Sequence, residues 1–134
     1  MKRSTHPGLL LFAHGARDPH WALPFEAVAQ LVRAGRPGLP VELAFLEFMS
    51  PNLSEAGHRL VALGCNDVAV VPLFLGAGGH VRKDLPALMT DMAHTHPRVT
   101  WRLQHAIGEV DSVIRAMAEA AMVLADHSPP SDTK

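Results

Sequence analysis

The stretch Gly8-Leu9-Leu10-Leu11-Phe12-Ala13-His14-Gly15 places a continuous apolar run directly before a histidine and a glycine. A short, unbroken apolar run is typical of a strand that is covered on both faces, as in a parallel sheet. Similar runs follow at Val41–Phe48, Asp67–Leu75 and Val99–Leu103. The sequence therefore predicts four strands of this kind.

Helix signals lie between the predicted strands. Asp18-Pro19 offers an N-cap followed by proline at the first helical position, and the helix runs to about Ala34. Pro24 means that this helix either kinks or begins a turn later. Ser50-Pro51 predicts a second helix start of the same type, and Gly64 stands where a left-handed C-cap belongs.

Two further helices are predicted, around Leu85–Ala93 and over Glu109–Asp126. Strands that alternate with helices imply a parallel sheet with helices on both faces and right-handed crossovers. We predict a flavodoxin-like three-layer α/β sandwich with strand order 2-1-3-4. Residues 1–127 are expected to form one domain, and the Ser- and Pro-rich residues 128–134 a disordered tail.

The composition narrows the classes of partner. The 134 residues carry 12 basic and 13 acidic side chains, so the net charge of -1 does not favour nucleic acid or an anionic membrane surface. No apolar run approaches the roughly 20 residues of a membrane span. Cys65 is the single cysteine, which excludes an intrachain disulfide and a thiolate cluster and makes a reducing cytoplasm the expected compartment.

Three metal-ligating side chains fall near the ends of predicted strands. His14 follows the first strand, Glu47 lies near the end of the second, and His80 follows the third after a short loop. Ligands of such sheets bind beyond the carboxyl ends of the strands, where the strand order reverses. Two imidazoles and a carboxylate suit a borderline divalent metal. Three protein ligands leave coordination positions of the metal open for ligand exchange.

The stretch Gly76-Ala77-Gly78-Gly79 is a candidate substrate-binding loop. It lacks the Gly-Lys-Ser/Thr ending of a P-loop and the spacing of a dinucleotide motif. Its glycines instead allow a flat ligand to approach the backbone, or form a nest of N–H groups for carboxylates. Three cations lie near the same edge and predict an anionic substrate: Arg17, Arg82 and Lys83.

Each of these residues also has a purely structural interpretation. A histidine after a strand can cap backbone groups, and a carboxylate such as Glu47 can simply be solvated. His94 and His96 resemble a short metal-binding tract, but they stand in a helix-to-strand connection that ends in Pro97. We interpret this pair as part of an ordinary loop.

Three blocks of the sequence together resemble one known family. Leu11–Pro19 is similar to the opening motif of the small CbiX-type sirohydrochlorin chelatases, Phe45–Pro51 to their second block, and Val71–Pro86 to their third and most specific block. The resemblance extends over residues 8–125, nearly the whole chain.

The resemblance implies a short-form, single-lobed chelatase that pairs with itself as a homodimer. Such an enzyme, of the lyase class, inserts cobalt or ferrous iron into sirohydrochlorin, releasing two protons, on the routes to cobalamin or siroheme. The divalent metal is a substrate, and no tightly bound cofactor is expected. By motif match, His14 and His80 are the metal-binding and catalytic histidines and Glu47 the assisting acid. Ala16 replaces the serine usual in the opening motif.

Two other classes of function remain open. The protein could be a metal or tetrapyrrole carrier that binds the same ligands without turnover. It could also be a subunit of a larger assembly, in which the histidines support a partner interface. Catalytic insertion by the pure protein distinguishes the enzyme from both.

Overall fold

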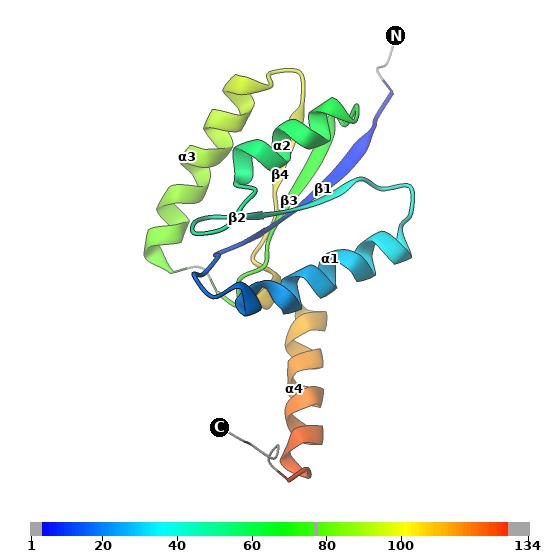
Figure 1. Ribbon diagram of the computed structural model, residues 1–134, viewed down its shortest axis with the longest axis vertical. Coiled ribbons are helices and arrows are strands. Elements are labelled where there is room, and N and C mark those ends of the chain that lie inside the picture. The colour runs from blue at the N-terminus through cyan, green and yellow to red at the C-terminus, as the bar shows by residue number, and fades with distance from the viewer. Residues whose placement is uncertain (1–3, 77, 129–134) are drawn as a thin grey trace.

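The computed structural model describes residues 4–76 and 78–128, with the side chains of residues 79–82 left out of the description. Strands and helices alternate along the chain (Figure 1). The elements are β1 (Pro7–Ala13), η1 (Pro19–Ala22), α1 (Leu23–Gly35), β2 (Val41–Phe45), α2 (Leu53–Ala62), β3 (Asp67–Pro72), α3 (Gly79–Thr95), β4 (Thr100–Leu103), η2 (Ile107–Glu109) and α4 (Asp111–Ala125), where η marks a short 3-10 helix. The predicted tail lies outside the described residues from position 129 onward. Among the described helices, none is long and apolar enough to cross a bilayer.

The four strands form one parallel sheet in the order β2-β1-β3-β4. In β1, Leu11 is level with Leu43 of β2 and with Val71 of β3. The predicted fold class and strand order are therefore confirmed. The order reverses at β1 and β3, so the loops after these two neighbouring strands flank the switch point.

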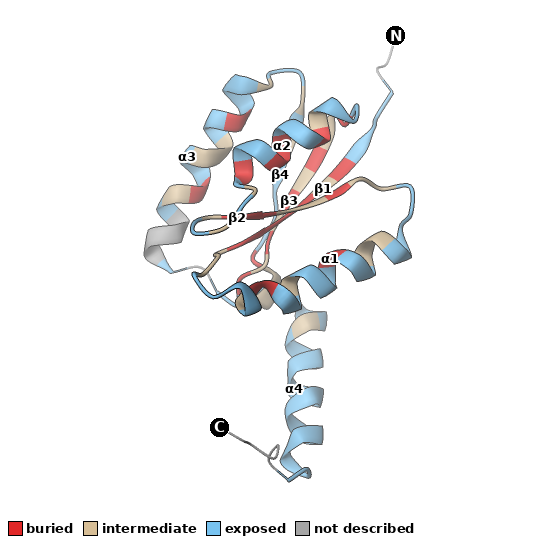
Figure 2. Ribbon diagram, viewed as in Figure 1, coloured by how far each residue is buried: buried red, intermediate tan, exposed pale blue. Residues whose placement is uncertain are grey.

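One face of the sheet is closely covered by α2 and α3 (Figure 1). Leu10 and Phe12 of β1 point into this layer, where they belong to the same buried cluster as Leu60 of α2 and Met92 of α3. All four side chains are at most 3% exposed. Figure 2 shows the buried positions concentrated in the strands and on the inner sides of these helices. This layer holds most of the hydrophobic core.

Of the described helices, α1 alone lies over the strands of the other face (Figure 1). Ala29 of α1 packs with Leu11 and Val41 in a smaller cluster. An apolar groove of about 710 Å³ remains open beside α1. The last helix, α4, projects from the body instead of lying over the sheet (Figure 1), and none of its residues is buried.

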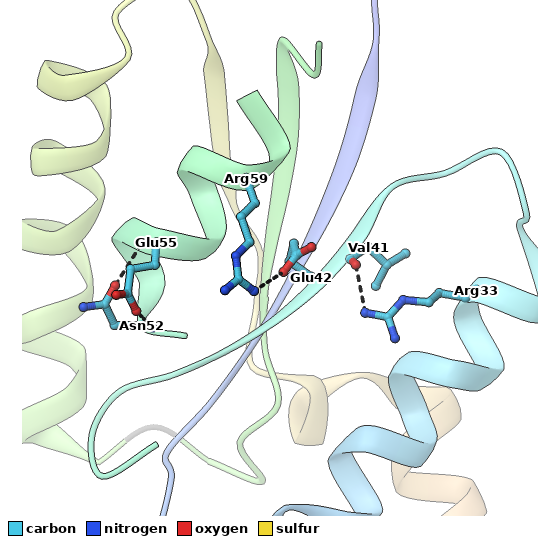
Figure 3. Close-up of polar contacts among 6 residues, drawn as sticks. All are labelled: Arg33, Val41, Glu42, Asn52, Glu55 and Arg59. Atoms are coloured by element: carbon cyan, nitrogen blue, oxygen red, sulfur yellow. Dashed lines mark hydrogen bonds and ion pairs between the residues drawn. The ribbon is translucent and has the colours of Figure 1, made fainter. Parts of the chain in front are cut away.

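The helix starts differ from the predictions in two places. Asp18 caps the short η1, accepting from the His20 N–H, and α1 begins a turn later with Pro24 in its first turn, the second of the two predicted alternatives. Ser50-Pro51 does not start α2; this prediction was wrong. Asn52 is the N-cap, because its side chain and that of Glu55 bond each other's backbone N–H groups in a reciprocal capping box (Figure 3).

Strand ends and the start of α3 also differ. The second predicted strand was too long, since β2 ends at Phe45 and Phe48 adopts a left-handed φ of 68°. The third ends at Pro72 rather than Leu75. The glycine loop leads into α3 already at Gly79, so the predicted start near Leu85 was late, although Pro86 lies inside the helix. Gly64 has the predicted positive φ, 95°.

Side-chain polar contacts fix β2 between the two helical layers (Figure 3). Arg59 of α2 lies 3.4 Å from the Glu42 carboxylate, and Arg33 of α1 donates to the carbonyl of Val41 at 2.9 Å. The edge strand is thus tied to a helix on either side.

Candidate active site at the carboxyl edge of the sheet

His14 is the first residue after β1, and its ring rests on the ring of Phe74. The two ring centroids are 4.1 Å apart with an interplanar angle of 29°. Phe74 is 3% exposed and lies two residues after β3, so it is a rigid part of the core. Within the described part of the chain, no group hydrogen-bonds the His14 ring nitrogens. The imidazole is therefore held by its face while its nitrogens remain available to a ligand.

The loop after β2 lies directly against the His14 loop. The Glu47 N–H donates to the carbonyl of His14 at 3.0 Å, and the Leu46 N–H donates to that of Ala13 at 2.9 Å. Gly15 makes this approach possible, because its φ is 91° and a Cβ there would lie 1.9 Å from the Glu47 carbonyl oxygen. Glu47 itself is exposed. The structure thus brings the predicted His14 and Glu47 to one edge through their backbones.

Arg17 belongs to the same edge. Its guanidinium carbon lies 4.7 Å from the centroid of the Phe48 ring, a cation–π arrangement. Phe48 is 57% exposed and stands in the left-handed region, which is strained for a bulky residue. Strain of this kind persists where the surrounding structure imposes it, and often at functional sites. The loop after β2 therefore exposes the Glu47 carboxylate and the Phe48 ring, and the Arg17 guanidinium lies over that ring.

The other predicted residues lie on the glycine loop and the first turn of α3. His80 and Arg82 stand in that turn, and their side chains are among those of residues 79–82 that are left out of the description. Lys83 is exposed. A Cβ added at Gly76 or Gly78 would meet nothing within 4 Å. These two glycines thus border open space.

Gly78 is the N-cap of α3 and makes no side-chain cap bond. Consequently the first amides of the helix have no side-chain acceptor at this cap, and the helix dipole places partial positive charge there. Such a terminus suits a carboxylate better than a cation. This is consistent with the predicted substrate-binding loop.

The described residues do not by themselves complete a metal site. Among them, no group of three or more His, Cys, Asp or Glu side chains could hold a metal ion. His14 and Glu47 are two of the three predicted donors, and the third, His80, stands on the element that follows the neighbouring strand. The metal-handling role of His80 therefore stays a prediction.

Two aromatic residues of the site escaped the sequence interpretation, namely Phe48 and Phe74. Both stand inside conspicuous blocks, but an aromatic residue near a strand is usually core, and nothing in the sequence tells which ring will lie under a histidine. The contact between His14 and Phe74 arises only when β1 and β3 pair. Once the strand order is predicted, the residues that follow β1 and β3 are expected to lie close together. This expectation is the sequence signal that could have found the contact.

The predicted loop histidines lie elsewhere. His94 falls within α3, and His96 follows it, with its ring 5.8 Å from that of His58 and 5.9 Å from that of Trp101. These rings lie around the carboxyl end of α3, whereas the candidate site lies at its amino end. The prediction that both histidines stand in a loop was wrong for His94, because α3 continues to Thr95 and His96 is its C-cap.

The parallel sheet of order β2-β1-β3-β4, with His14 and Glu47 at its carboxyl edge, defines a flavodoxin-like α/β protein. Comparison with known proteins specifies the family. The CbiX family model matches residues 8–122. The chain therefore belongs to the CbiX family.

Individual relatives agree with this assignment. A sirohydrochlorin cobaltochelatase of Saccharolobus islandicus is 40% identical over 82 residues, which cover 61% of this chain and 62% of that protein. A crystal structure of a cobalamin biosynthesis CbiX protein from Marinobacter aquaeolei VT8 aligns with a TM-score of 0.82 and 31% identity, over 91% of this chain and 99% of that chain. The sirohydrochlorin chelatase SirB of Bacillus subtilis subspecies spizizenii, solved with cobalt, shares the fold with a TM-score of 0.78 at 23% identity, over 94% of this chain and 56% of that chain.

Proposed function

We propose that this protein is a chelatase that inserts cobalt or ferrous iron into sirohydrochlorin, in cobalamin or siroheme biosynthesis. The observation that carries the proposal is the His14 imidazole, seated on Phe74 with its nitrogens unpaired among the described residues, beside the Glu47 loop. The chain's membership of the CbiX family and the names of its relatives supply the substrate.

In this mechanism His14 and His80 hold the incoming metal at the carboxyl edge. Neutral imidazoles bind cobalt and ferrous iron, and a pair of them leaves coordination positions for the pyrrole nitrogens. The stacking on Phe74 fixes the plane of the His14 ring, so the metal would be presented in one direction. The metal passes on to the product and is a substrate.

Two protons leave the pyrrole nitrogens as the metal–nitrogen bonds form, which keeps the charge balanced. Glu47, or an imidazole that has released its metal, accepts them as the general base. Arg17, Arg82 and Lys83 bind the peripheral carboxylates of the tetrapyrrole through charge-assisted hydrogen bonds. The open glycine loop lets the flat ring lie close to the backbone.

We further propose that the active form is a homodimer. SirB, of which this chain covers 56%, has almost twice the length, whereas the Marinobacter protein is matched over 99% of its chain. Two copies of the present chain would supply the mass of one longer chelatase. The single, buried Cys65 suits a reducing compartment, and we place the activity in the cytoplasm.

The direct test is anaerobic absorbance spectroscopy of sirohydrochlorin with catalytic amounts of the pure protein, adding cobalt or ferrous iron in separate runs. We expect spectral conversion faster than the protein-free rate with at least one metal, and loss of this acceleration in a folded His80→Ala variant. Stoichiometric binding of metal or tetrapyrrole without turnover would overturn the proposal in favour of a carrier. Normal turnover by His80→Ala would remove that residue from the mechanism.

A further inference from the structure

Phe48 occupies a backbone conformation that its side chain does not favour. Among the described residues it is the non-glycine residue with a left-handed backbone, with a φ of 68°. Such a position suits Gly, Asn or Asp, and it is strained for a bulky aromatic residue. The side chain is also 57% exposed, so it adds little to the hydrophobic core. Neither backbone preference nor burial therefore explains a phenylalanine here.

The residues on either side of Phe48 anchor the loop and leave its ring at the surface. Leu46 and Met49 are half-buried, and they pack against two different core clusters. The Phe45 N–H donates to the carbonyl of Pro51 at 2.9 Å, which closes the loop at its base. The ring of Phe48 is thus presented from a loop that is fixed on both sides.

The exposed ring carries Arg17, which belongs to the neighbouring loop after β1. The guanidinium carbon lies 4.7 Å from the ring centroid. Arg17 makes no hydrogen bond or ion pair within the part of the chain that the structure describes, so the ring is the contact that positions its charge. A cation–π contact leaves the N–H donors of a guanidinium available for a carboxylate. Arg17 is therefore held in place with its donors unused.

This arrangement also leaves Arg17 unpaired with the nearest carboxylate in the sequence of the second loop. Glu47 directly precedes Phe48 and is exposed, yet in the described structure it forms no ion pair with Arg17. Pairing of the two would engage both charges with each other. With the guanidinium over the Phe48 ring, the cation remains available for an anionic ligand and the carboxylate for a proton.

His14 is positioned in a similar way, by the face of Phe74, with 4.1 Å between the ring centroids. His14 and Arg17 stand three residues apart on one loop, so two aromatic rings hold its two polar groups. Phe74 is 3% exposed, and burial in the core is sufficient to explain it. Phe48 is exposed and strained, so its ring needs an explanation outside the core.

We infer that Phe48 is a substrate-positioning residue, whose ring holds the Arg17 guanidinium where it binds a peripheral carboxylate of the tetrapyrrole. This inference rests on the proposed function and adds a residue to the same site. A flat macrocycle with carboxylates on its rim requires a cation beside the imidazole that carries the metal. The ring of Phe48 does not touch the reacting atoms, so it affects binding of the tetrapyrrole and not the insertion step.

Steady-state kinetics with sirohydrochlorin test this role. Phe48→Leu removes the ring and should raise the KM for the tetrapyrrole about 2–5-fold with kcat nearly constant, the range of an exposed cation–π contact. Phe48→Tyr keeps the ring face and should retain the wild-type KM. Leu63→Ala, which shortens a 67% exposed apolar side chain before β3, is the control and should also retain it. An unchanged KM in Phe48→Leu would overturn the inference.

A double variant tests whether the ring acts through Arg17. The KM of the Arg17→Ala, Phe48→Leu protein should equal that of Arg17→Ala alone, because the ring has no cation left to position. If the two substitutions instead multiply each other's effects on KM, the ring contacts the substrate independently of Arg17. That result would overturn the positioning role.

Thermal melts separate substrate positioning from a contribution to the fold. Phe48→Asn and Phe48→Leu both remove the ring, but asparagine tolerates a left-handed backbone better than leucine. We expect Phe48→Asn to melt at a higher temperature than Phe48→Leu, while both variants show the raised KM. A KM that rises only as the melting temperature falls would show a structural role and overturn the inference.

Equilibrium binding of metal-free sirohydrochlorin, followed by absorbance, separates this inference from the proposed function. If the wild type binds the tetrapyrrole but inserts no metal, the chelatase is overturned, and weaker binding by Phe48→Leu than by Phe48→Tyr supports the positioning role. If the wild type inserts metal and Phe48→Leu has the same KM and Kd, the positioning role is overturned and the chelatase is retained. A wild type that binds no sirohydrochlorin overturns both.

Discussion

The two ends of the sheet use their polar side chains in opposite ways. At the end where the strands begin, Asp67 pairs with Arg102 at 2.8 Å, and the Asn66 side chain bonds the backbone of His6 and Ser4 at 2.7 and 2.8 Å. At the end where β1 and β2 finish, His14 and Glu47 make no side-chain hydrogen bond or ion pair among the described residues.

This difference separates polar groups that hold the fold from those that are left for a ligand. A side chain paired within the chain contributes to the folded structure and has little capacity left to bind anything else. An imidazole positioned by stacking alone keeps both nitrogens available. Substitutions at the two ends should therefore affect different measurements, and the following predictions test this.

The largest expected effect is that of His14→Ala on metal insertion. Loss of the imidazole should lower the rate about 100-fold or more, the range typical of removing a catalytic acid–base group. The melting temperature should change little, because the ring makes no hydrogen bond in the described structure. His20→Ala is the control, since that side chain is 84% exposed and pairs with Asp18 at 3.2 Å, away from the candidate site. A folded His14→Ala protein with more than half the wild-type rate would contradict the site.

Phe74→Leu should have the next largest effect, a roughly 10-fold slower insertion, because the His14 ring loses the surface that fixes its plane. Phe12→Leu is a matched control: it removes the same atoms from the same buried cluster, and among the described residues the Phe12 ring pairs with Phe74, 6.1 Å between centroids, whereas the ring stacked on His14 is that of Phe74. Both variants should lose about 1–2 kcal/mol of stability, measured by urea denaturation. Equal loss of activity in both would show that Phe74 acts through stability alone.

A smaller effect is expected for Arg17→Ala. The KM for the tetrapyrrole should rise about 3–10-fold with kcat nearly constant, because an exposed cation anchors a carboxylate without touching the reacting atoms. Arg102→Ala, at the other end of the sheet, should leave KM unchanged and cost less than about 1 kcal/mol of stability, as for most exposed ion pairs. Steady-state kinetics at fixed metal concentration compare the two. A similar KM for the two variants would show that Arg17 does not bind the substrate.

The smallest effect concerns Cys65, at the end of the sheet where the strands begin. Burial raises the pKa of its thiol above the ordinary value of 9.0, because the apolar surroundings disfavour the thiolate. The unfolded chain loses this proton first, so the stability that Cys65 provides is present below pH 9 and is lost as the pH rises through the higher folded pKa. Above pH 9, the melting temperature of the wild type should fall more steeply with rising pH than that of Cys65→Ala. Parallel curves would contradict this, and metal insertion near neutral pH should be the same for both proteins.

Local sequence was sufficient for much of the fold and for part of the site. The apolar run from Gly8 to Ala13 predicts a buried parallel strand, because such a strand must be apolar on both faces. Its position next to a histidine, together with the alternating elements, places His14 at the carboxyl edge. Boundaries were less predictable. Ser50-Pro51 was the predicted helix start, but the reciprocal bonds of Asn52 and Glu55 place the start at Asn52. The Asn-x-x-Glu spacing behind these bonds is a local signal that the prediction did not use.

The sequence by itself determined the order of elements, the strand pattern and the chemical types of the site residues, because these depend on periodicity and on side-chain chemistry along the chain. Only the tertiary structure decided that Phe74 lies under His14 and that Gly15 must approach Glu47, since these contacts join neighbouring strands that are far apart in sequence. The tertiary structure also decided that α4 leaves its own sheet. An amphipathic pattern specifies an apolar face, whereas the rigid joint at Gly108 and Val110 fixes where that face points.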